Sequence, residues 1–315
     1  MKPLVVITGP TAVGKTELSI KIAKAIDGEI ISADSIQVYK HMDIGSAKIT
    51  KEEMQGIKHY LVDEFEPDEE FNVHVFKEKT LEYMDKIYEA GKIPIIVGGT
   101  GFYIQSVLYD IQFNDEEIDS AYRKKLENIA KEKGNDYLHN MLREVDEESA
   151  LNIHKNNLKR VIRALEFYKN TGEKISTHNE EQSQNISPYN FVYFVLNDKR
   201  ELLYERINKR VDIMFDKGLV NEVKNLLNMG YTKDLVSMNG IGYKEVVDYI
   251  NGKYSLDETK EIIKRETRHF AKRQLTWFRR EKDVTMVNYF DYDSIDDTLK
   301  YMINTLREKD IIKND

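Results

Sequence analysis

The 315-residue chain has no cysteine, and its five prolines do not cluster in a linker. The lack of cysteine excludes thiol catalysis, CxxC redox chemistry and a cysteine-ligated zinc site, and it fits a reducing compartment. No apolar run approaches the roughly 18 residues that a membrane span needs, and the apolar start at residues 4–7 is too short for the core of a signal peptide. We therefore expect a soluble, cytoplasmic protein.

Positive charge is in the minority, because 47 Lys and Arg residues stand against 55 Asp and Glu residues and give a formal net charge of -8. This balance argues against a globally basic nucleic-acid coat, although a local basic stripe can still lie on an acidic protein. The hydrophobic content of 41% is ordinary for a globular chain. At roughly 100–200 residues per domain, the length predicts about two domains.

The first hundred residues alternate short β-branched runs with amphipathic segments. Residues 4–7, 29–33 and 93–97 read as buried strands, and residues 16–26 and 73–90 read as helices. Each strand run ends in polar or glycine-rich sequence. Such alternation predicts a parallel α/β sheet with helices on both faces, and ligands then bind beyond the carboxyl ends of the strands.

The pattern becomes purely helical over residues 115–185, which we interpret as an inserted helical domain. Strand character returns at residues 191–196 and 283–289. Further helices are predicted over residues 200–216, 256–280 and 295–306. The expected organisation is a P-loop core domain made of residues 1–114 and 186–315, interrupted by the insertion.

A phosphate-binding motif lies between the first strand and the first helix, where GPTAVGKT matches G-x-x-x-x-G-K-[ST]. Its backbone amides and the helix N-terminus favour phosphate oxygens, its lysine supplies a positive charge, and its last hydroxyl is a ligand for Mg²⁺. We expect Mg²⁺ as cofactor, with Thr16 as its ligand. The residues predicted to bind a diphosphate or nucleotide are Gly9, Pro10, Thr11, Ala12, Val13, Gly14, Lys15 and Thr16.

The P-loop alone does not define a reaction. A typical nucleoside-triphosphate hydrolase ends a neighbouring strand in an acidic residue that holds Mg²⁺, whereas residues 93–97 are followed by Gly98-Gly99-Thr100. The bound phosphate can therefore belong to a leaving group. Asp34 follows the strand at residues 29–33, and its position fits a general base, a metal ligand or a helix cap.

Several segments together resemble one family, the tRNA dimethylallyltransferases, also called tRNA isopentenyltransferases. The resemblance runs from residue 3 to about residue 280. The matching segments are GPTAVGKT (9–16), DSIQVY (34–39), DIGSAK (43–48), VGGTG (97–101), KRVDIM (209–214), GLVNEV (218–223), GIGYK (240–244) and AKRQLTWFR (271–279).

The resemblance implies transfer of a dimethylallyl group from dimethylallyl diphosphate to the exocyclic amine of the adenine beside the tRNA anticodon, at position 37, with release of diphosphate. It implies that Asp34 is the catalytic base and that Thr100 hydrogen-bonds the oxygen between the allylic carbon and phosphorus. Arg210 is either a clamp on the diphosphate or part of a solvated helix face.

The resemblance further implies that the anticodon stem-loop of tRNA is the macromolecular partner, and the target base is expected to flip into a pocket. We also expect a monomer without an obligatory protein partner. Gln37 suits an adenine edge, or is an exposed turn residue. The expected tRNA-binding residues are Asp34, Ser35, Ile36, Gln37, Thr100, Arg123, Asn156, Asn157, Leu158, Lys159, Arg160, Asn239, Gly240, Ile241, Gly242, Tyr243, Lys244, Lys272 and Arg273.

One predicted helix is strongly basic. Between Lys264 and Arg280 it carries seven Lys and Arg residues against Glu266 alone, opposite an apolar stripe that includes Trp277. Trp277 is expected in the core. The basic face is either simply solvated or contacts a nucleic-acid backbone, in which case binding is salt-sensitive.

Three other functions remain to be distinguished. A related enzyme prenylates a free adenine nucleotide, but such a substrate does not require the insertion and the basic helix. A P-loop small-molecule kinase would use the Arg206 and Arg210 helix as a lid. A noncatalytic RNA-binding module would not need Asp34 and Thr100 at the positions that match the family.

Overall fold

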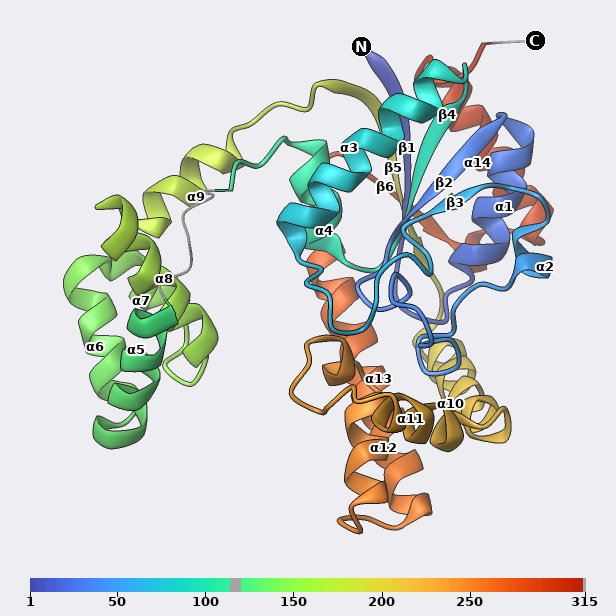
Figure 1. The fold of residues 1–315 in the computed structure, drawn as a ribbon. Coiled ribbons are helices and arrows are strands. Elements are labelled where there is room, and N and C mark those ends of the chain that lie inside the picture. Colours follow the sequence, from blue (N-terminus) through green and yellow to red (C-terminus); the bar gives the residue numbers. More distant parts are fainter. Residues whose placement is uncertain (114–119, 314–315) are drawn as a thin grey trace. The chain divides into compact units, whose positions relative to one another are not determined.

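The computed structural model describes residues 1–113 and 120–313. Its centre is a parallel six-stranded sheet with the order β3-β2-β4-β1-β5-β6, which confirms the predicted α/β fold (Figure 1). The strands are β1 (Lys2–Thr8), β2 (Gly28–Ala33), β3 (His59–Tyr60), β4 (Ile93–Gly98), β5 (Tyr189–Asn197) and β6 (Val284–Asn288).

The three strands that carry the predicted motifs end at the same level. Thr8 of β1 and Ala33 of β2 both pair with Gly98 of β4. The Thr8 hydroxyl also donates to the Gly98 carbonyl at 2.6 Å. Because parallel strands place their carboxyl ends at one edge, the segments that follow β1, β2 and β4 meet there.

Helices pack on both faces of this sheet (Figure 1). α1 and α14 cover one face, and α3 and α4 cover the other, while α10 to α13 extend beyond the carboxyl ends of the strands. The helices of this part are α1 (Lys15–Ala25), α2 (Lys51–Met54), α3 (Val73–Glu89), α4 (Gly101–Leu108), α10 (Arg200–Asp216), α11 (Leu219–Asn228), α12 (Tyr243–Ile250), α13 (Leu256–Phe278) and α14 (Ile295–Glu308), with short 3-10 turns η1 (Ser237–Asn239) and η2 (Tyr289–Asp291).

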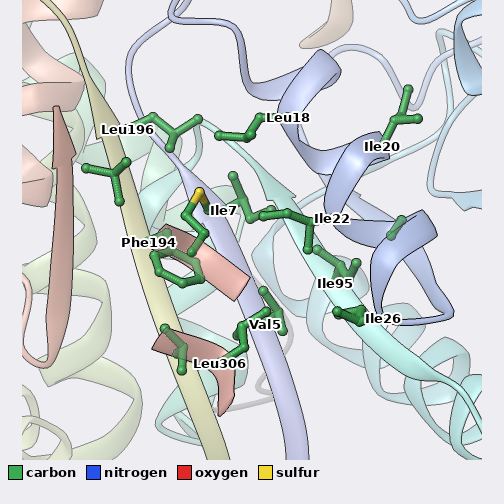
Figure 2. Packing of buried hydrophobic residues seen from close by; sticks show 14 of the residues in the cluster. Val5, Ile7, Leu18, Ile20, Ile22, Ile26, Ile95, Phe194, Leu196 and Leu306 are labelled. Carbon is green, nitrogen blue, oxygen red and sulfur yellow. The ribbon is translucent and has the colours of Figure 1, made fainter. Parts of the chain in front are cut away.

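One apolar core lies between the sheet and the α1/α14 layer. Val5 and Ile7 of β1 point to Ile22 of α1, and Phe194 of β5 and Leu306 of α14 complete the contact (Figure 2). All five side chains are fully buried. Burial of apolar surface contributes a stabilising free energy of about 25 cal/mol per Å². This burial therefore stabilises the sheet on which the site is built.

The strand at His59–Tyr60 is an element that the sequence does not predict, and the helices α2, α4, α11 and α12 are others. This strand has two residues, which are too few to form an alternation pattern, and it pairs with Ile30 and Ile31 of β2. The other strands match the prediction to within two or three residues. α13 begins after Ser255, whose side chain and that of Glu258 form a reciprocal capping box.

The chain divides into two compact units, Met1–Leu108 with Pro188–Asp315, and Tyr109–Ser187. The first domain boundary predicted from the sequence, between residues 114 and 115, lies outside the described residues. The second unit has its own apolar core and contains α5 (Ser120–Lys133), α6 (Asn135–Val145), α7 (Glu147–Asn152), α8 (Leu158–Thr171) and α9 (Ile175–Ser183).

Buried polar contacts also organise the second unit. The Asp146 carboxylate accepts hydrogen bonds from the backbone and hydroxyl groups of Ser149 and Ser176, which connects α7 to α9. Among the described helices of the whole chain, none has the length and the apolar character to cross a lipid bilayer.

Candidate active site and RNA-binding surface

A cavity of about 470 Å³ opens beyond the carboxyl ends of β1, β2 and β4. Thr11, Asp34 and Thr100 line it from the sheet edge, and Arg210 and Gln274 line it from α10 and α13. Because β1, β2 and β4 end at the same level of the sheet, the residues that follow these three strands lie around one cavity.

A second cavity, of about 60 Å³, lies beside the first. Lys15, Thr16 and Ser32 line this smaller cavity, and Asp34 lines both. The Asp34 carboxylate is therefore placed between the phosphate-binding motif and the larger cavity.

The loop at residues 9–16 has the backbone that its glycines predict. Gly9 and Gly14 have φ angles of 145° and 97°, and a Cβ atom on Gly9 would lie 2.4 Å from the carbonyl oxygen of Leu196. Lys15 donates through Nζ to the carbonyls of Gly9 and Pro10, each at 2.9 Å. This geometry closes the loop around the start of α1.

The surroundings of Lys15 disfavour its charged form. Its pKa is lowered from 10.5 to about 8, first by burial and then by the charge of Arg210, while the charge of Asp34 acts in the opposite direction. Burial also lowers the pKa of Arg210, and the Asp34 charge opposes that shift. Two cations and one carboxylate thus share the site, which favours an additional anion.

Asp34 uses one carboxylate oxygen locally. Its Oδ1 accepts from the backbone amides of Ile36 at 2.9 Å and Gln37 at 3.2 Å, which fixes the turn after β2. Its Oδ2 makes no hydrogen bond with the described part of the chain. The capping interaction therefore coexists with an oxygen that can accept a proton.

Thr100 begins the turn into α4. Its amide donates to the Ala33 carbonyl at 3.2 Å, and its side chain lines the larger cavity. Gly98 permits this close approach, because a Cβ atom there would lie 2.2 Å from the Ala33 oxygen. Thr100 and Asp34 consequently face one cavity from adjacent strands.

Gln274 is a site residue that the sequence analysis names only as part of a motif. Its Oε1 accepts from the amide of Thr11 at 2.9 Å, and its Nε2 donates to the carbonyl of Gly99 at 3.0 Å. It is 6% exposed, so α13 ties the phosphate-binding loop to the end of β4 through a buried amide. A polar residue on the apolar side of an amphipathic helix is the signal that identifies it.

Arg210 extends from α10 into the larger cavity, so its guanidinium is not part of a solvated face. It makes no ion pair with residues 1–113 or 120–313. Arg206, one turn earlier, is paired instead with the buried Asp198 at 2.7 Å. The ion pair of Arg206 with Asp198 and the position of Arg210 at the larger cavity distinguish two arginines that look equivalent in the sequence.

The segment after Asp34 has two functions in the structure. Ser35 and Ile36 line the larger cavity, but Gln37 lines only the smaller one. The Gln37 Nε2 donates to the carbonyls of Ser46 and Ala47, both at 3.3 Å. Gln37 therefore holds the neighbouring loop, and its contact with an adenine edge stays a prediction.

The predicted loop at residues 239–244 also reaches the larger cavity. Asn239, Gly240, Ile241 and Lys244 line it. Tyr243 does not, because its side chain is fully buried. The Tyr243 side chain supports the loop from inside, and a contact of this residue with tRNA stays a prediction. Gly242, with a φ of 104°, starts α12.

The inserted unit contains the remaining predicted RNA contacts. Arg123 forms a bidentate pair with the buried Glu166, with distances of 2.8 and 2.7 Å. Lys159 and Arg160 line a cavity of about 700 Å³ within this unit. The other predicted positions are Asn156, whose side chain accepts from Asn135, Asn157, which precedes α8, and Leu158, which begins it.

The basic helix α13 has two different halves. In its first half, Lys264 pairs with Asp212 at 2.9 Å and Arg268 donates to Asn208. Around its C-terminal end, four exposed cations form no ion pair with the described residues and lie around a cavity of about 660 Å³ or next to it. They are Lys272, Arg273, Arg279 and Arg280.

The residues beside the phosphate-binding loop also suit Mg²⁺. No cluster of three or more His, Cys, Asp or Glu side chains that could hold a metal occurs in the described residues. Mg²⁺ does not require such a cluster, because it usually keeps several waters and takes one or two protein oxygens together with substrate phosphates. The Thr16 hydroxyl and the Asp34 carboxylate at the smaller cavity provide oxygens of that kind.

The fold and the site together define a class, the parallel α/β proteins in which a glycine-rich strand-to-helix loop borders a cavity at the strand ends. The family model described as IPP transferase matches residues 37–281. The tRNA dimethylallyltransferase of Lachnoclostridium phytofermentans is 60% identical over 99% of this chain and 100% of its own. The chain belongs to this family of transferases, which confirms the resemblance found in its motifs.

Further relatives agree over nearly the whole chain. The tRNA dimethylallyltransferase of Acetivibrio thermocellus is 54% identical over 97% of this chain and 98% of its own. The structure of the tRNA isopentenylpyrophosphate transferase from Bacillus halodurans has a TM-score of 0.74 at 43% identity, with 98% of both chains covered. A eukaryotic dimethylallyltransferase acting on tRNA has a TM-score of 0.82 at 29% identity, covering 98% of this chain and 80% of that one.

Proposed function

We propose that this protein transfers the dimethylallyl group of dimethylallyl diphosphate to the exocyclic amine of adenine 37 in tRNA and releases diphosphate. The observation that carries the proposal is the position of Asp34, which lines both the cavity beside Lys15 and Thr16 and the larger cavity. A carboxylate at that position lies between a bound diphosphate and an acceptor base.

The donor diphosphate binds at the loop of residues 9–16. The loop amides and the N-terminus of α1 face its oxygens. Lys15 and Arg210 supply positive charge, which the Asp34 carboxylate alone does not balance. Thr16 would hold Mg²⁺, which neutralises charge on the diphosphate when it is bound. These contacts make diphosphate a better leaving group.

The transfer is a substitution at the allylic carbon. The exocyclic nitrogen of adenine forms the new C–N bond as the C–O bond to diphosphate breaks, and the electron pair of that bond leaves with diphosphate. Asp34 accepts the proton that the amine loses. The Thr100 hydroxyl donates a hydrogen bond to the bridging oxygen, where negative charge develops.

The acceptor is presented as a flipped base. An adenine stacked in an anticodon loop cannot reach a buried carbon, so it enters the larger cavity beside Ser35 and Ile36. The exposed cations at the end of α13 and Lys159 and Arg160 of the inserted unit bind the RNA backbone, which positions the RNA without reading its sequence. One chain supplies every group in this scheme, so we propose that the enzyme acts as a monomer. We also propose that it acts in the cytoplasm.

Purified protein is incubated with MgCl₂, dimethylallyl diphosphate and an unmodified tRNA whose anticodon ends in A, followed by nucleoside mass analysis. AMP and ATP serve as parallel acceptors. The expected product is a prenylated adenosine from tRNA alone. A product from AMP would instead identify a free-nucleotide prenyltransferase, and ATP turnover without prenyl transfer would identify a phosphoryl-transfer enzyme.

A further inference from the structure

The carboxylate of Glu222, on α11, accepts four hydrogen bonds. Its Oε2 accepts from the backbone amides of Asp43 at 3.0 Å and Ile44 at 2.7 Å. Its Oε1 accepts from the amide of Gly45 at 3.0 Å and from the hydroxyl of Tyr243 at 2.8 Å. Converging backbone amides of this kind form an anion-binding concavity, and here the anion is a side chain of the same protein.

Tyr243 extends this contact by one residue. Its hydroxyl also accepts from the amide of Ser46 at 3.1 Å, so four consecutive amides of the loop end on the Glu222–Tyr243 pair. The ring lies directly against Gly45, where a Cβ atom would approach it to 2.6 Å. The loop at residues 43–48 is thus attached both by hydrogen bonds and by close packing.

This attached loop leads to the catalytic segment. The carbonyls of Ser46 and Ala47 accept from the side-chain Nε2 of Gln37. The backbone amide of Gln37 donates to the carboxylate of Asp34. Gly45 and Ser46 also line the larger cavity. A displacement of the loop would therefore change the surroundings of Asp34 directly.

The same pair supports the opposite side of the cavity. Tyr243 begins α12, and its amide donates to the carbonyl of Gly240 at 3.2 Å. Gly240 and Ile241 line the larger cavity. The Glu222–Tyr243 pair consequently joins the loop next to Asp34 to the loop that we expect to contact RNA.

We propose that Glu222 and Tyr243 are positioning residues that hold these two loops in register around the target adenine and thereby keep Asp34 oriented toward the acceptor amine. This inference rests on the proposed function. A glutamine at position 222 would present an amide donor to backbone donors, which leaves at least one partly buried donor without an acceptor. A misplacement of about 1 Å can cost about 100-fold in rate.

The test is single-turnover prenylation with saturating tRNA and dimethylallyl diphosphate, using Glu222→Gln and Tyr243→Phe. We expect a rate about 100-fold lower for Glu222→Gln and about 10-fold lower for Tyr243→Phe, because the latter loses only the hydroxyl contacts. The KM for dimethylallyl diphosphate should stay within about twofold, since the phosphate-binding loop is not part of this contact.

Asp248→Asn is the matched control, because this carboxylate lies on α12 and binds only Lys233 and Lys253 at the surface. Its rate should match wild type. An equal loss in the control, a loss that follows the melting temperature across all three variants, or a wild-type rate for both test variants would overturn the inference. If the wild-type protein gives no product, the proposed function itself is wrong. If the wild-type protein is active and the variants behave in one of these ways, only the inference is wrong.

Discussion

In the proposed reaction the Asp34 carboxylate both holds the turn after β2 and accepts a proton, and a conservative substitution separates these two functions. In Asp34→Asn the side-chain oxygen still accepts from Ile36 and Gln37, so the turn should persist. The amide cannot take the proton of the acceptor amine, and we expect the single-turnover rate to fall by about 10²–10⁴-fold. The dissociation constant for tRNA should change by no more than a few-fold, as measured by filter binding.

Asp85→Asn is the control for this experiment, because Asp85 forms only a surface ion pair with Lys2. Its rate and tRNA affinity should equal those of wild type. If Asp34→Asn loses tRNA binding and keeps its rate, the assignment of Asp34 as a base is wrong.

We expect donor binding to depend on pH through Lys15. Its ammonium is favoured by a bound diphosphate, and in the free protein its pKa is lowered to about 8. The protonated form is present below that pH and is lost above it. Titration calorimetry from pH 7 to 9.5 should show the dissociation constant of dimethylallyl diphosphate rising above pH 8, by at most about tenfold per pH unit.

The variant Lys15→Met has no group to titrate there and should bind the donor weakly with little change across this range. A wild-type affinity that stays constant from pH 7 to 9.5 would show that Lys15 keeps its proton throughout.

The residues of the site could be predicted from the sequence where a motif lies next to a strand, as for Lys15, Asp34 and Thr100. Contacts over long distances in the chain could not. Gln274 bonds to Thr11, 263 residues away, and no local pattern predicts which backbone group a buried amide will meet. The burial of Tyr243 could not be predicted from the sequence either, because a short glycine-rich motif is typical of an exposed loop.

At the scale of elements, the contact between α4 and α13 depends on a missing side chain. A Cβ atom on Gly101 would lie 2.2 Å from Nε1 of Trp277. Gly101→Ala should therefore push α13 away and destabilise the fold by about 1–3 kcal/mol, as overpacking does. Urea denaturation measures this change.

The double variant Gly101→Ala/Trp277→Phe provides the control. The smaller ring gives room for the added methyl group, so the two substitutions together should cost less than the sum of their separate effects. Strict additivity would mean that the two residues do not compete for the same space.

The strands and helices that are predicted with bounds follow from periodicity and capping, and their observed bounds lie close to the predicted ones, whereas α2, α4, α11 and α12 are not predicted. α3 begins at the Asn72 cap, and Gly91, with a φ of 73°, ends the turn that follows it. β3 could not be predicted, because two residues make no pattern and the strand exists only through its pairing with β2. A short strand of this kind is determined by tertiary structure alone.

For the whole molecule, charge distribution matters more than net charge. The protein carries a formal charge of -8, yet the C-terminal end of α13 exposes four cations that have no ion-pair partner in residues 1–113 and 120–313. We expect tRNA affinity to fall steeply with salt. Arg280→Ala should reduce the slope of log Kd against log salt concentration by about 1.

Lys300→Ala is the comparison, since Lys300 is paired with Asp297 on α14, away from these cations. It should leave the slope unchanged. If both variants show the wild-type slope, the end of α13 does not meet the RNA backbone.

The order of the strands also has a consequence for synthesis on the ribosome. β1 lies between β4 and β5 in the sheet, and β5 begins 91 residues after β4 ends. At a synthesis rate of roughly 5–20 residues per second, one side of β1 has no strand partner for about 5–18 seconds while the inserted unit is being made. During that interval the nascent chain presents an apolar sheet edge, and binding of a chaperone to this edge would be of greatest benefit then.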